Sequence, residues 1–325
     1  MQRLDHDNTA HAAAQPLRLG IIGSLEDQYV AELGRRFPGV NVVPATAEDL
    51  GALVVWDQNV DATIRAIQQH PRLPWVHLRW AGVPEPVLDA VRTHPAELTN
   101  GSGAHGPAIA EYVAGVVLAH YKGLHVLRAA QTRAEWLADF RMRELRGQLV
   151  GVIGLGDLGL SIARALRPFG VELRGLRRTT APTPEVDRIF APAALSEFLD
   201  GLHVLVVAAP LTPQTHGLIG AAELARLAAG ALLVNVGRAA IVDDAALVSA
   251  LRADGLGGAA LDVFMDEPLP PSSPLWAMPN VYISPHCADA TPESRERGLA
   301  LFLDNLGRFV RGEQLRNVVD RQAGY

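Results

Sequence analysis

One stretch, residues 149–178, constrains the fold of this chain more than any other. It opens with an apolar run of strand length, Leu149–Ile153, and continues into the turn Gly154-Leu155-Gly156-Asp157-Leu158-Gly159. Apolar residues then recur at spacings of three and four up to Phe169, which predicts a helix that Gly170 ends. A second strand is predicted over Val171–Leu176. Strand, GxGxxG turn, helix and strand in this order are the fingerprint of a dinucleotide-binding unit.

The three glycines of this turn have separate physical roles. Gly154 permits the tight turn, Gly156 lets the backbone approach a pyrophosphate, and Gly159 lets the helix pack close to the strand. The first turn of the helix adds unpaired N–H groups and a partial positive charge. A glycine turn alone is common, but the strands and helix around this one make it specific. We therefore expect residues 154–159 to bind the phosphates of a dinucleotide.

The residues after the second strand indicate which dinucleotide binds. An NAD-binding unit usually has a carboxylate about 20 residues beyond the glycine turn, where it binds the ribose 2′-hydroxyl. This chain has Arg177 and Arg178 there, and the next carboxylate on the C-terminal side is Glu185. Two guanidinium groups suit a 2′-phosphate. The pattern favours NADP(H), with NAD(H) possible, and the alternative is a pair of solvated surface arginines.

Length and composition restrict the class of protein. The 325 residues suffice for two domains, and 49% hydrophobic with 20% charged residues is typical of a globular protein. A net charge of −6 gives no reason to expect nucleic acid or a membrane as partner. Residues 1–15 are expected to be a tail, not a signal peptide, and a cytoplasmic location is the default. The lone Cys287 excludes an internal disulfide, and no metal site is expected.

Residues 17–104 alternate between strand and helix patterns, which predicts a small parallel sheet covered by helices. The expected strands are Leu17–Ile22, Val40–Val43, Leu53–Trp56 and Trp75–Leu78, and the expected helices are one ending near Phe37, Val60–Gln69 and Pro84–Arg92. After the last of these strands, the backbone N–H groups of Ala81, Gly82 and Val83 lie where ligands of α/β sheets bind and are suited to a carboxylate. Taken alone, these residues are more simply an ordinary strand-to-helix turn.

Two helices, Ala108–Leu127 and Gln131–Glu144 with Trp136, are expected before the fingerprint. Beyond it, the pattern predicts further strands and helices: strands Leu202–Val207, Ala231–Val236, Gly258–Val263 and Val281–Ile283, and helices Ala222–Ala229, Asp243–Ala253 and Thr291–Arg311. Pro210 and Thr215 follow the first of these strands, Val236 ends the second, and all three are candidates to contact the ribose or nicotinamide.

Three polar residues of different kinds follow three of these strands: Arg238, Glu267 and His286. They suffice for hydride transfer between a nicotinamide and a 2-oxo acid. The arginine can hold the substrate carboxylate and polarise the 2-oxo group, and the imidazolium can give a proton to the oxygen. The glutamate can orient the imidazole ring and stabilise its charged form. Each has an ordinary structural explanation alone, but together they predict an active site.

The motifs in their fixed order resemble the D-isomer-specific 2-hydroxyacid dehydrogenases. The resemblance extends from about Leu17 to Asp320, and the motifs that carry it are Gly154-Leu-Gly-Asp-Leu-Gly159, Pro210-Leu-Thr-Pro-Gln-Thr215, Asn235-Val-Gly-Arg-Ala239, Leu261-Asp-Val-Phe-Met-Asp-Glu-Pro268 and Ser284-Pro-His-Cys-Ala288. Ala239 departs from the glycine that is usual after the catalytic arginine.

The resemblance implies a fold, a site and an activity. The fold would be α/β, with two Rossmann-like, doubly wound parallel-sheet domains and the active site in the cleft between them. A flavodoxin-like substrate-binding domain would comprise residues 1–104 and 289–325, and a Rossmann domain residues 105–288. Arg238, Glu267 and His286 would be the catalytic trio, Asp262 would contact the nicotinamide carboxamide, and residues 81–83 would bind the substrate carboxylate together with Arg238 and His286.

We therefore expect a homodimeric enzyme that reduces a small 2-oxo acid, with glyoxylate and hydroxypyruvate as the first candidates. The alternative is a dinucleotide-sensing scaffold, similar to some co-repressors that share this fold, with weak dehydrogenase activity. The intact catalytic trio argues against pure scaffolding.

Overall fold

The computed structural model describes residues 16–322 and 324 of the chain. The chain forms two compact units, one of residues 16–79, 83–100, 302–322 and 324 and the other of residues 80–82 and 101–301. The boundary between residues 301 and 302 falls inside helix α10, Pro292–Arg311. The tail predicted for residues 1–15 lies outside the described residues. Within the described part of the chain, every helix is too short or too polar to cross a bilayer.

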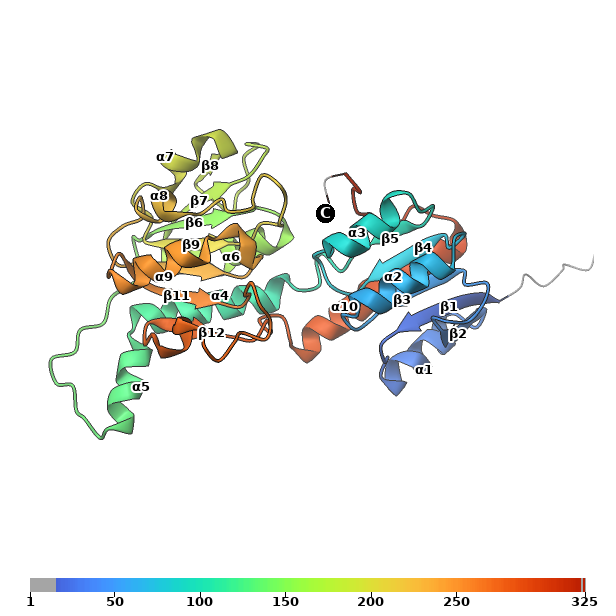
Figure 1. Cartoon of the computed structure of the whole chain (residues 1–325), viewed down its shortest axis with the longest axis horizontal. Coiled ribbons are helices and arrows are strands. Elements are labelled where there is room, and N and C mark those ends of the chain that lie inside the picture. Colours follow the sequence, from blue (N-terminus) through green and yellow to red (C-terminus); the bar gives the residue numbers. More distant parts are fainter. Residues whose placement is uncertain (1–15, 323, 325) are drawn as a thin grey trace, which may run out of the picture. The chain divides into compact units, whose positions relative to one another are not determined.

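The smaller unit is built on a parallel sheet in the strand order β2-β1-β3-β4-β5. This is the doubly wound order of flavodoxin-like folds. Its elements are β1 Leu17–Ile22, α1 Asp27–Arg36, β2 Val40–Pro44, β3 Ala52–Val55, α2 Val60–Gln69, β4 Trp75–Leu78, α3 Glu85–Arg92, β5 Glu97–Thr99 and the C-terminal part of α10 (Figure 1).

Aromatic contacts fix the end of α10 to the smaller sheet. Phe302 is fully buried and stacks on Trp75 of β4 with 6.0 Å between ring centroids. Trp56, directly after β3, meets the same phenylalanine edge-on at 6.5 Å. Large aromatic rings bury much apolar surface and hold specific geometries. The last half of α10 is therefore part of this unit's core.

The larger unit contains a parallel sheet in the order β12-β11-β10-β9-β6-β7-β8. The strand order reverses between β6 and β9, as in a Rossmann fold. Its elements are α4 Gly106–Tyr121, α5 Leu124–Thr132, β6 Leu149–Ile153, α6 Asp157–Leu166, β7 Glu172–Leu176, β8 Arg188–Phe190, α7 Leu195–Leu199, β9 Val204–Val207, α8 Ala221–Leu224, β10 Ala231–Asn235, α9 Asp244–Arg252, β11 Leu256–Leu261, β12 Val281–Ile283 and the first part of α10.

The core of the larger unit lies on both faces of this sheet. All four residues of β9 are buried: Leu205 and Val207 join one apolar cluster, and Val204 and Val206 join the other. Successive side chains of a strand point to opposite faces. Helices cover both faces, so the strand can be apolar throughout. The α/β class and the two doubly wound sheets expected from the sequence are confirmed.

The helices predicted before the fingerprint are partly wrong. A break at Gly123, which has a left-handed φ of +60°, splits the predicted helix Ala108–Leu127 into α4 and α5. The predicted helix Gln131–Glu144 does not form, because α5 ends at Thr132 and the chain then runs without helix to residue 148. Trp136 on this segment is 92% exposed, so its side chain adds no core packing that would stabilise a helix here.

Smaller differences concern short elements. The sequence patterns missed β5, β8 and α7, which are three to five residues long. The helix predicted over Ala222–Ala229 is reduced to α8, Ala221–Leu224. Near the C-terminus, Val318 forms a single antiparallel bridge with Thr99.

Candidate active site

The glycine turn joins β6 to α6 and is shaped by close backbone contacts. Gly154 has a φ of +88°, and a side chain there would lie 2.7 Å from the backbone of Ala209. A side chain at Gly159 would collide with the carbonyl oxygen of Gly154. Beside Gly156, by contrast, nothing lies within 4 Å of where a Cβ would be. Two glycines therefore close the turn, and the middle one faces open space.

This open space fits the diphosphate of a dinucleotide. The turn leads into α6 at Asp157, and Gly156 precedes the first helical residue. The N–H groups of Asp157 and Leu158 belong to the first turn of the helix, where backbone donors have no partner within the helix. Leu155 is buried and packs against Gly175 of β7, so it anchors the turn through its side chain. The residues predicted for the phosphates thus form one continuous cradle.

Arg177 and Arg178 follow β7 as predicted, but they differ in their surroundings. Arg177 is half-buried, and its guanidinium donates hydrogen bonds to the carbonyl oxygens of Thr179, at 2.7 Å, and Ala181. Arg178 is exposed. Arg177 therefore shapes the turn after the strand, and Arg178 is the more accessible of the two cations.

The other residues predicted to contact the cofactor lie at the ends of β9 and β10. The Thr215 hydroxyl donates a hydrogen bond to the Pro210 carbonyl at 2.7 Å and accepts one from the Thr212 N–H at 2.7 Å. This closes the turn after β9 on itself. Val236, the first residue after β10, is buried.

Asn235, at the end of β10, shapes the turn that presents Arg238. Its amide oxygen accepts a hydrogen bond from the Gly237 N–H at 3.1 Å, and its amide nitrogen donates one to the Arg238 carbonyl at 3.2 Å. The guanidinium of Arg238 is half-buried, donates to the Gly237 carbonyl at 2.7 Å and lies against Gly82. Burial lowers the pKa of Arg238, and the negative charge of Glu267 opposes this shift. Arginine nevertheless stays charged in proteins.

Ala81 and Gly82 belong to the larger unit and Val83 to the smaller one. The structure therefore brings one member of the predicted carboxylate loop, Gly82, into contact with the predicted carboxylate-binding arginine.

Glu267 and His286 form a direct pair. His286 Nδ1 lies 2.9 Å from Glu267 Oε2, and the other carboxylate oxygen accepts a hydrogen bond from the Phe264 N–H at 3.0 Å. The two side chains are 39% and 38% exposed, so a small molecule can reach the imidazole. Since Nδ1 faces the carboxylate, Nε2 is the nitrogen left to exchange a proton with a ligand.

The backbone of His286 has a φ of +50°, in the left-handed region. A residue with a Cβ pays about 1–3 kcal/mol for such a conformation. It persists only where the surrounding structure holds it, and strain of this kind clusters at functional sites.

Asp262, just after β11, is 4% exposed and contacts residues on both sides of His286. Its Oδ1 accepts hydrogen bonds from the Ser284 hydroxyl at 2.6 Å, the Cys287 N–H at 2.9 Å and the Ala288 N–H at 3.1 Å. Its Oδ2 accepts from the Ala288 N–H at 3.2 Å. Burial raises the pKa of Asp262, while these hydrogen bonds and the charge of His286 act in the opposite direction. The contact with the nicotinamide that the resemblance implies for Asp262 stays a prediction.

Sequence reasoning missed Asn235, Ser284 and Tyr112 as members of the site. Asn235 and Ser284 stand inside motifs that the resemblance uses, and both directly follow or end a buried strand, so their position was a usable signal. Tyr112 on α4 gave none, since its contact with Ser284 joins residues 172 apart in the chain.

Among the described residues, no group of three or more His, Cys, Asp or Glu side chains is placed to hold a metal ion.

Comparison with known proteins decides the family. Residues 114–288 match the model for "D-isomer specific 2-hydroxyacid dehydrogenase, NAD binding domain". The chain is also 32% identical to glyoxylate/hydroxypyruvate reductase A of Klebsiella pneumoniae over 309 residues, which cover 91% of this chain and 96% of the relative. The chain belongs to the D-isomer specific 2-hydroxyacid dehydrogenases.

Solved structures agree with this assignment to the dehydrogenases. A D-isomer specific 2-hydroxyacid dehydrogenase from Xanthobacter autotrophicus Py2, in complex with NADPH and MES, has a TM-score of 0.83 and 32% identity and covers 96% of this chain and 100% of its own. An NADPH-dependent glyoxylate/hydroxypyruvate reductase from Sinorhizobium meliloti, in complex with NADP and sulfate, has a TM-score of 0.82 and 29% identity at the same coverage. This dehydrogenase is therefore an oxidoreductase with the two-sheet architecture of its family.

Proposed function

We propose that this dehydrogenase uses NADPH to reduce a small 2-oxo acid, glyoxylate or hydroxypyruvate, to the 2-hydroxy acid. The observation that carries the proposal is the pair of His286 and Glu267, 2.9 Å apart at the end of the sheet that carries the glycine cradle. Two relatives support the substrate and the cofactor: the glyoxylate/hydroxypyruvate reductase A of Klebsiella pneumoniae and the NADPH-dependent glyoxylate/hydroxypyruvate reductase of Sinorhizobium meliloti. The comparisons do not support the alternative of a dinucleotide-sensing scaffold.

NADPH, when bound, supplies a hydride for C2 of the substrate. The residues of this chain manage the proton and the charge. His286, protonated on both nitrogens, gives the Nε2 proton to the oxygen on C2. The neutral ring keeps the proton on Nδ1 and donates it in a hydrogen bond to Glu267. Glu267, held by the Phe264 N–H, fixes the ring orientation and stabilises the imidazolium before the transfer.

Arg238 binds the substrate carboxylate and draws electron density from the 2-oxo group. Its guanidinium is suited to a two-point contact with a carboxylate. Half-burial strengthens that contact, because the effective dielectric is lower than in water. We assign the backbone of Ala81, Gly82 and Val83 to the other side of the same carboxylate, since the arginine already lies against Gly82.

The cofactor residues follow from the cradle. The backbone of residues 154–159 would hold the diphosphate, Arg178 with Arg177 the 2′-phosphate, and Pro210, Thr215 and Val236 the ribose and nicotinamide face. The dinucleotide-binding domain, residues 105–288, would lie within the larger unit. The substrate domain, residues 1–104 and 289–325, would be built on the sheet of the smaller unit.

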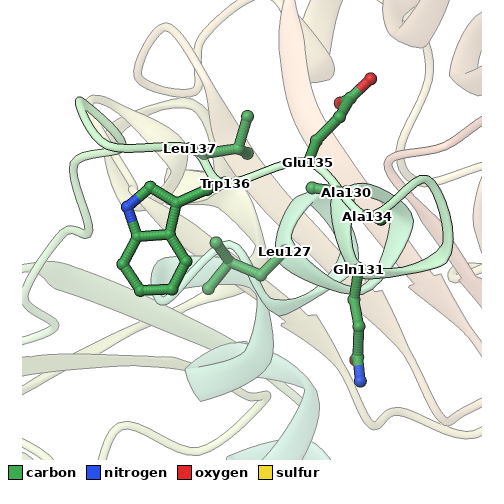
Figure 2. A pocket seen from close by; sticks show the side chains of 7 residues that line it. All are labelled: Leu127, Ala130, Gln131, Ala134, Glu135, Trp136 and Leu137. Atoms are coloured by element: carbon green, nitrogen blue, oxygen red, sulfur yellow. The ribbon is translucent and has the colours of Figure 1, made fainter.

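We further propose a homodimer, held by the arm formed by α5 and residues 133–144. The arm projects from the rest of the larger unit (Figure 1) and exposes Leu124, Trp136 and Met142 by 49%, 92% and 56%. A hollow of about 450 Å³ is lined by Leu127, Trp136 and Leu137 together with Ala130, Gln131, Ala134 and Glu135 (Figure 2). Exposed apolar side chains in this number mark a protein interface. We place the enzyme in the cytoplasm.

Steady-state turnover tests the activity. Purified protein is mixed with NADPH or NADH and with glyoxylate, hydroxypyruvate or pyruvate, and the absorbance of the reduced cofactor is followed. The proposal predicts turnover with glyoxylate and hydroxypyruvate that is faster with NADPH. Absence of turnover with all three acids, despite tight NADPH binding, would contradict it. Light scattering of the same sample tests the dimer.

A further inference from the structure

The loop that carries His286 is wrapped around one buried carboxylate. Asp262 receives hydrogen bonds from residues on both sides of His286: Ser284 before it and Cys287 and Ala288 after it. The Ala288 N–H contacts both carboxylate oxygens, at 3.1 and 3.2 Å. The strained φ of His286 thus lies inside a loop whose two ends are held by the same side chain.

A second residue extends this arrangement to helix α4. Ser284 Oγ lies 2.6 Å from Asp262 Oδ1 and 2.8 Å from the Tyr112 hydroxyl. Because an ionised carboxylate only accepts, the single Ser284 proton goes to Asp262 and the Tyr112 hydroxyl donates to Ser284. Tyr112 and Ser284 are half-buried, and Asp262 is buried. A hydrogen-bonded chain therefore runs from α4 through Ser284 to the carboxylate that holds the loop.

We infer that Asp262, with Ser284 and Tyr112, is a positioning network that holds His286 in its productive orientation. The inference rests on the proposed function, in which His286 supplies the proton. In this inference Asp262 acts by holding the loop that carries His286. This role differs from the nicotinamide contact that the resemblance implies. The two roles predict different defects: a positioning role affects the proton-transfer step, and a nicotinamide contact affects cofactor binding.

The kinetic test compares Asp262→Asn, Ser284→Ala, Ser284→Thr and Tyr112→Phe with the wild type. In Asp262→Asn an amide N–H faces the Ala288 N–H, so two donors oppose each other and the loop is displaced. A displacement of about 1 Å should lower kcat roughly 100-fold. Ser284→Ala should lose roughly 10-fold, Ser284→Thr should recover most of that loss because it keeps the hydroxyl, and Tyr112→Phe should have the smallest effect. KM for the 2-oxo acid and Kd for NADPH, from NADPH fluorescence, should change by less than about 3-fold. Ser249→Ala, exposed on α9, is the matched control.

A second readout needs neither cofactor nor substrate. Hydrogen exchange of the Cys287 and Ala288 amides should become at least about tenfold faster in Asp262→Asn and Ser284→Ala, with the strands β10 and β11 unchanged. If wild-type protein reduces no 2-oxo acid, the proposed function fails, and the exchange result still decides whether the network holds the loop. Unchanged exchange overturns the inference. So does a weakened NADPH affinity with normal kcat at saturation, which would mark Asp262 as a cofactor contact.

Discussion

The guanidinium of Arg238 occupies the space that a side chain at Gly82 would need. This contact joins two residues that the sequence had assigned to the same ligand group, the substrate carboxylate. Any Cβ at residue 82 must displace the end of the Arg238 side chain, which is flexible, rather than backbone atoms. The cost of such a change should therefore appear in catalysis and not in folding.

Gly82→Ala is expected to lower kcat/KM for the 2-oxo acid by roughly 10- to 100-fold, because Arg238 is moved from its position. The melting temperature should stay within about 3 °C of the wild type, since a ΔΔG below about 1 kcal/mol shifts it no further in a chain of this size. Gly103→Ala is not a clean control because its φ is +95°. Gly115→Ala on α4, with nothing within 4 Å, is the matched variant. A strongly destabilised but fully active Gly82→Ala protein would contradict the geometry.

Glu267→Gln is expected to lower kcat for reduction by roughly 10- to 100-fold, because the carboxylate that faces Nδ1 of His286 also fixes the orientation of the ring. His286→Ala should reduce kcat by roughly 10²- to 10⁴-fold. Steady-state turnover at saturating NADPH measures both variants, and a Glu267→Gln enzyme with the kcat of the wild type would count against the pair.

Arg178→Ala should weaken NADPH and leave NADH nearly unaffected. Loss of one charged hydrogen-bond partner of a phosphate costs about 1.5–3 kcal/mol, or roughly 10- to 100-fold in KM for NADPH. Arg177→Ala should impair both cofactors, because that side chain also holds the carbonyl oxygens of Thr179 and Ala181. Arg188→Ala, exposed on β8, is the control. Equal losses for NADPH and NADH in Arg178→Ala would argue that the residue has no phosphate to bind.

The smaller unit should lose stability in mild acid because of His77. Burial lowers the pKa of His77 to about 3, whereas in the unfolded chain the same group titrates near 6.5. Between pH 6.5 and pH 3, His77 is protonated in the unfolded state but neutral in the folded state. The free energy of unfolding therefore falls as pH falls toward 3. At pH 5 this amounts to about 2 kcal/mol. Urea unfolding at pH 7 and pH 5 measures the loss, and His77→Phe should reduce it. An identical pH slope in wild type and His77→Phe would refute this source.

Much of the fold was predictable because its strands are short apolar runs bounded by glycine or proline. Leu149–Ile153 and Trp75–Leu78 have the bounds that the sequence predicted. Because both faces of the sheet are buried, such strands are apolar throughout and can be recognised in the sequence. Edge strands are less apolar, which explains why Arg188–Phe190, with an exposed arginine, was missed.

Other features depend on contacts that no local pattern contains. Residues 133–144 have helix-forming side chains, but residues 133–139 are exposed, while Phe140 lies against Gly123 and Arg143 over the ring of Tyr121. Gly123 could have predicted the end of the helix, but the apolar residues on both sides of it favoured one long helix. The catalytic trio was predicted from its place after three strands, whereas Tyr112 joins Ser284 only through the tertiary fold.

Transfer of deuterium from NADPH labelled at the nicotinamide C4 position tests the central claim most directly. Hydroxypyruvate is the substrate, and the product is analysed by mass spectrometry and chiral chromatography. The account predicts D-glycerate with one deuterium at C2, as expected for transfer of a hydride from the cofactor to that carbon. Glycerate without deuterium at C2 from either face of the labelled cofactor, or the L isomer, would contradict it.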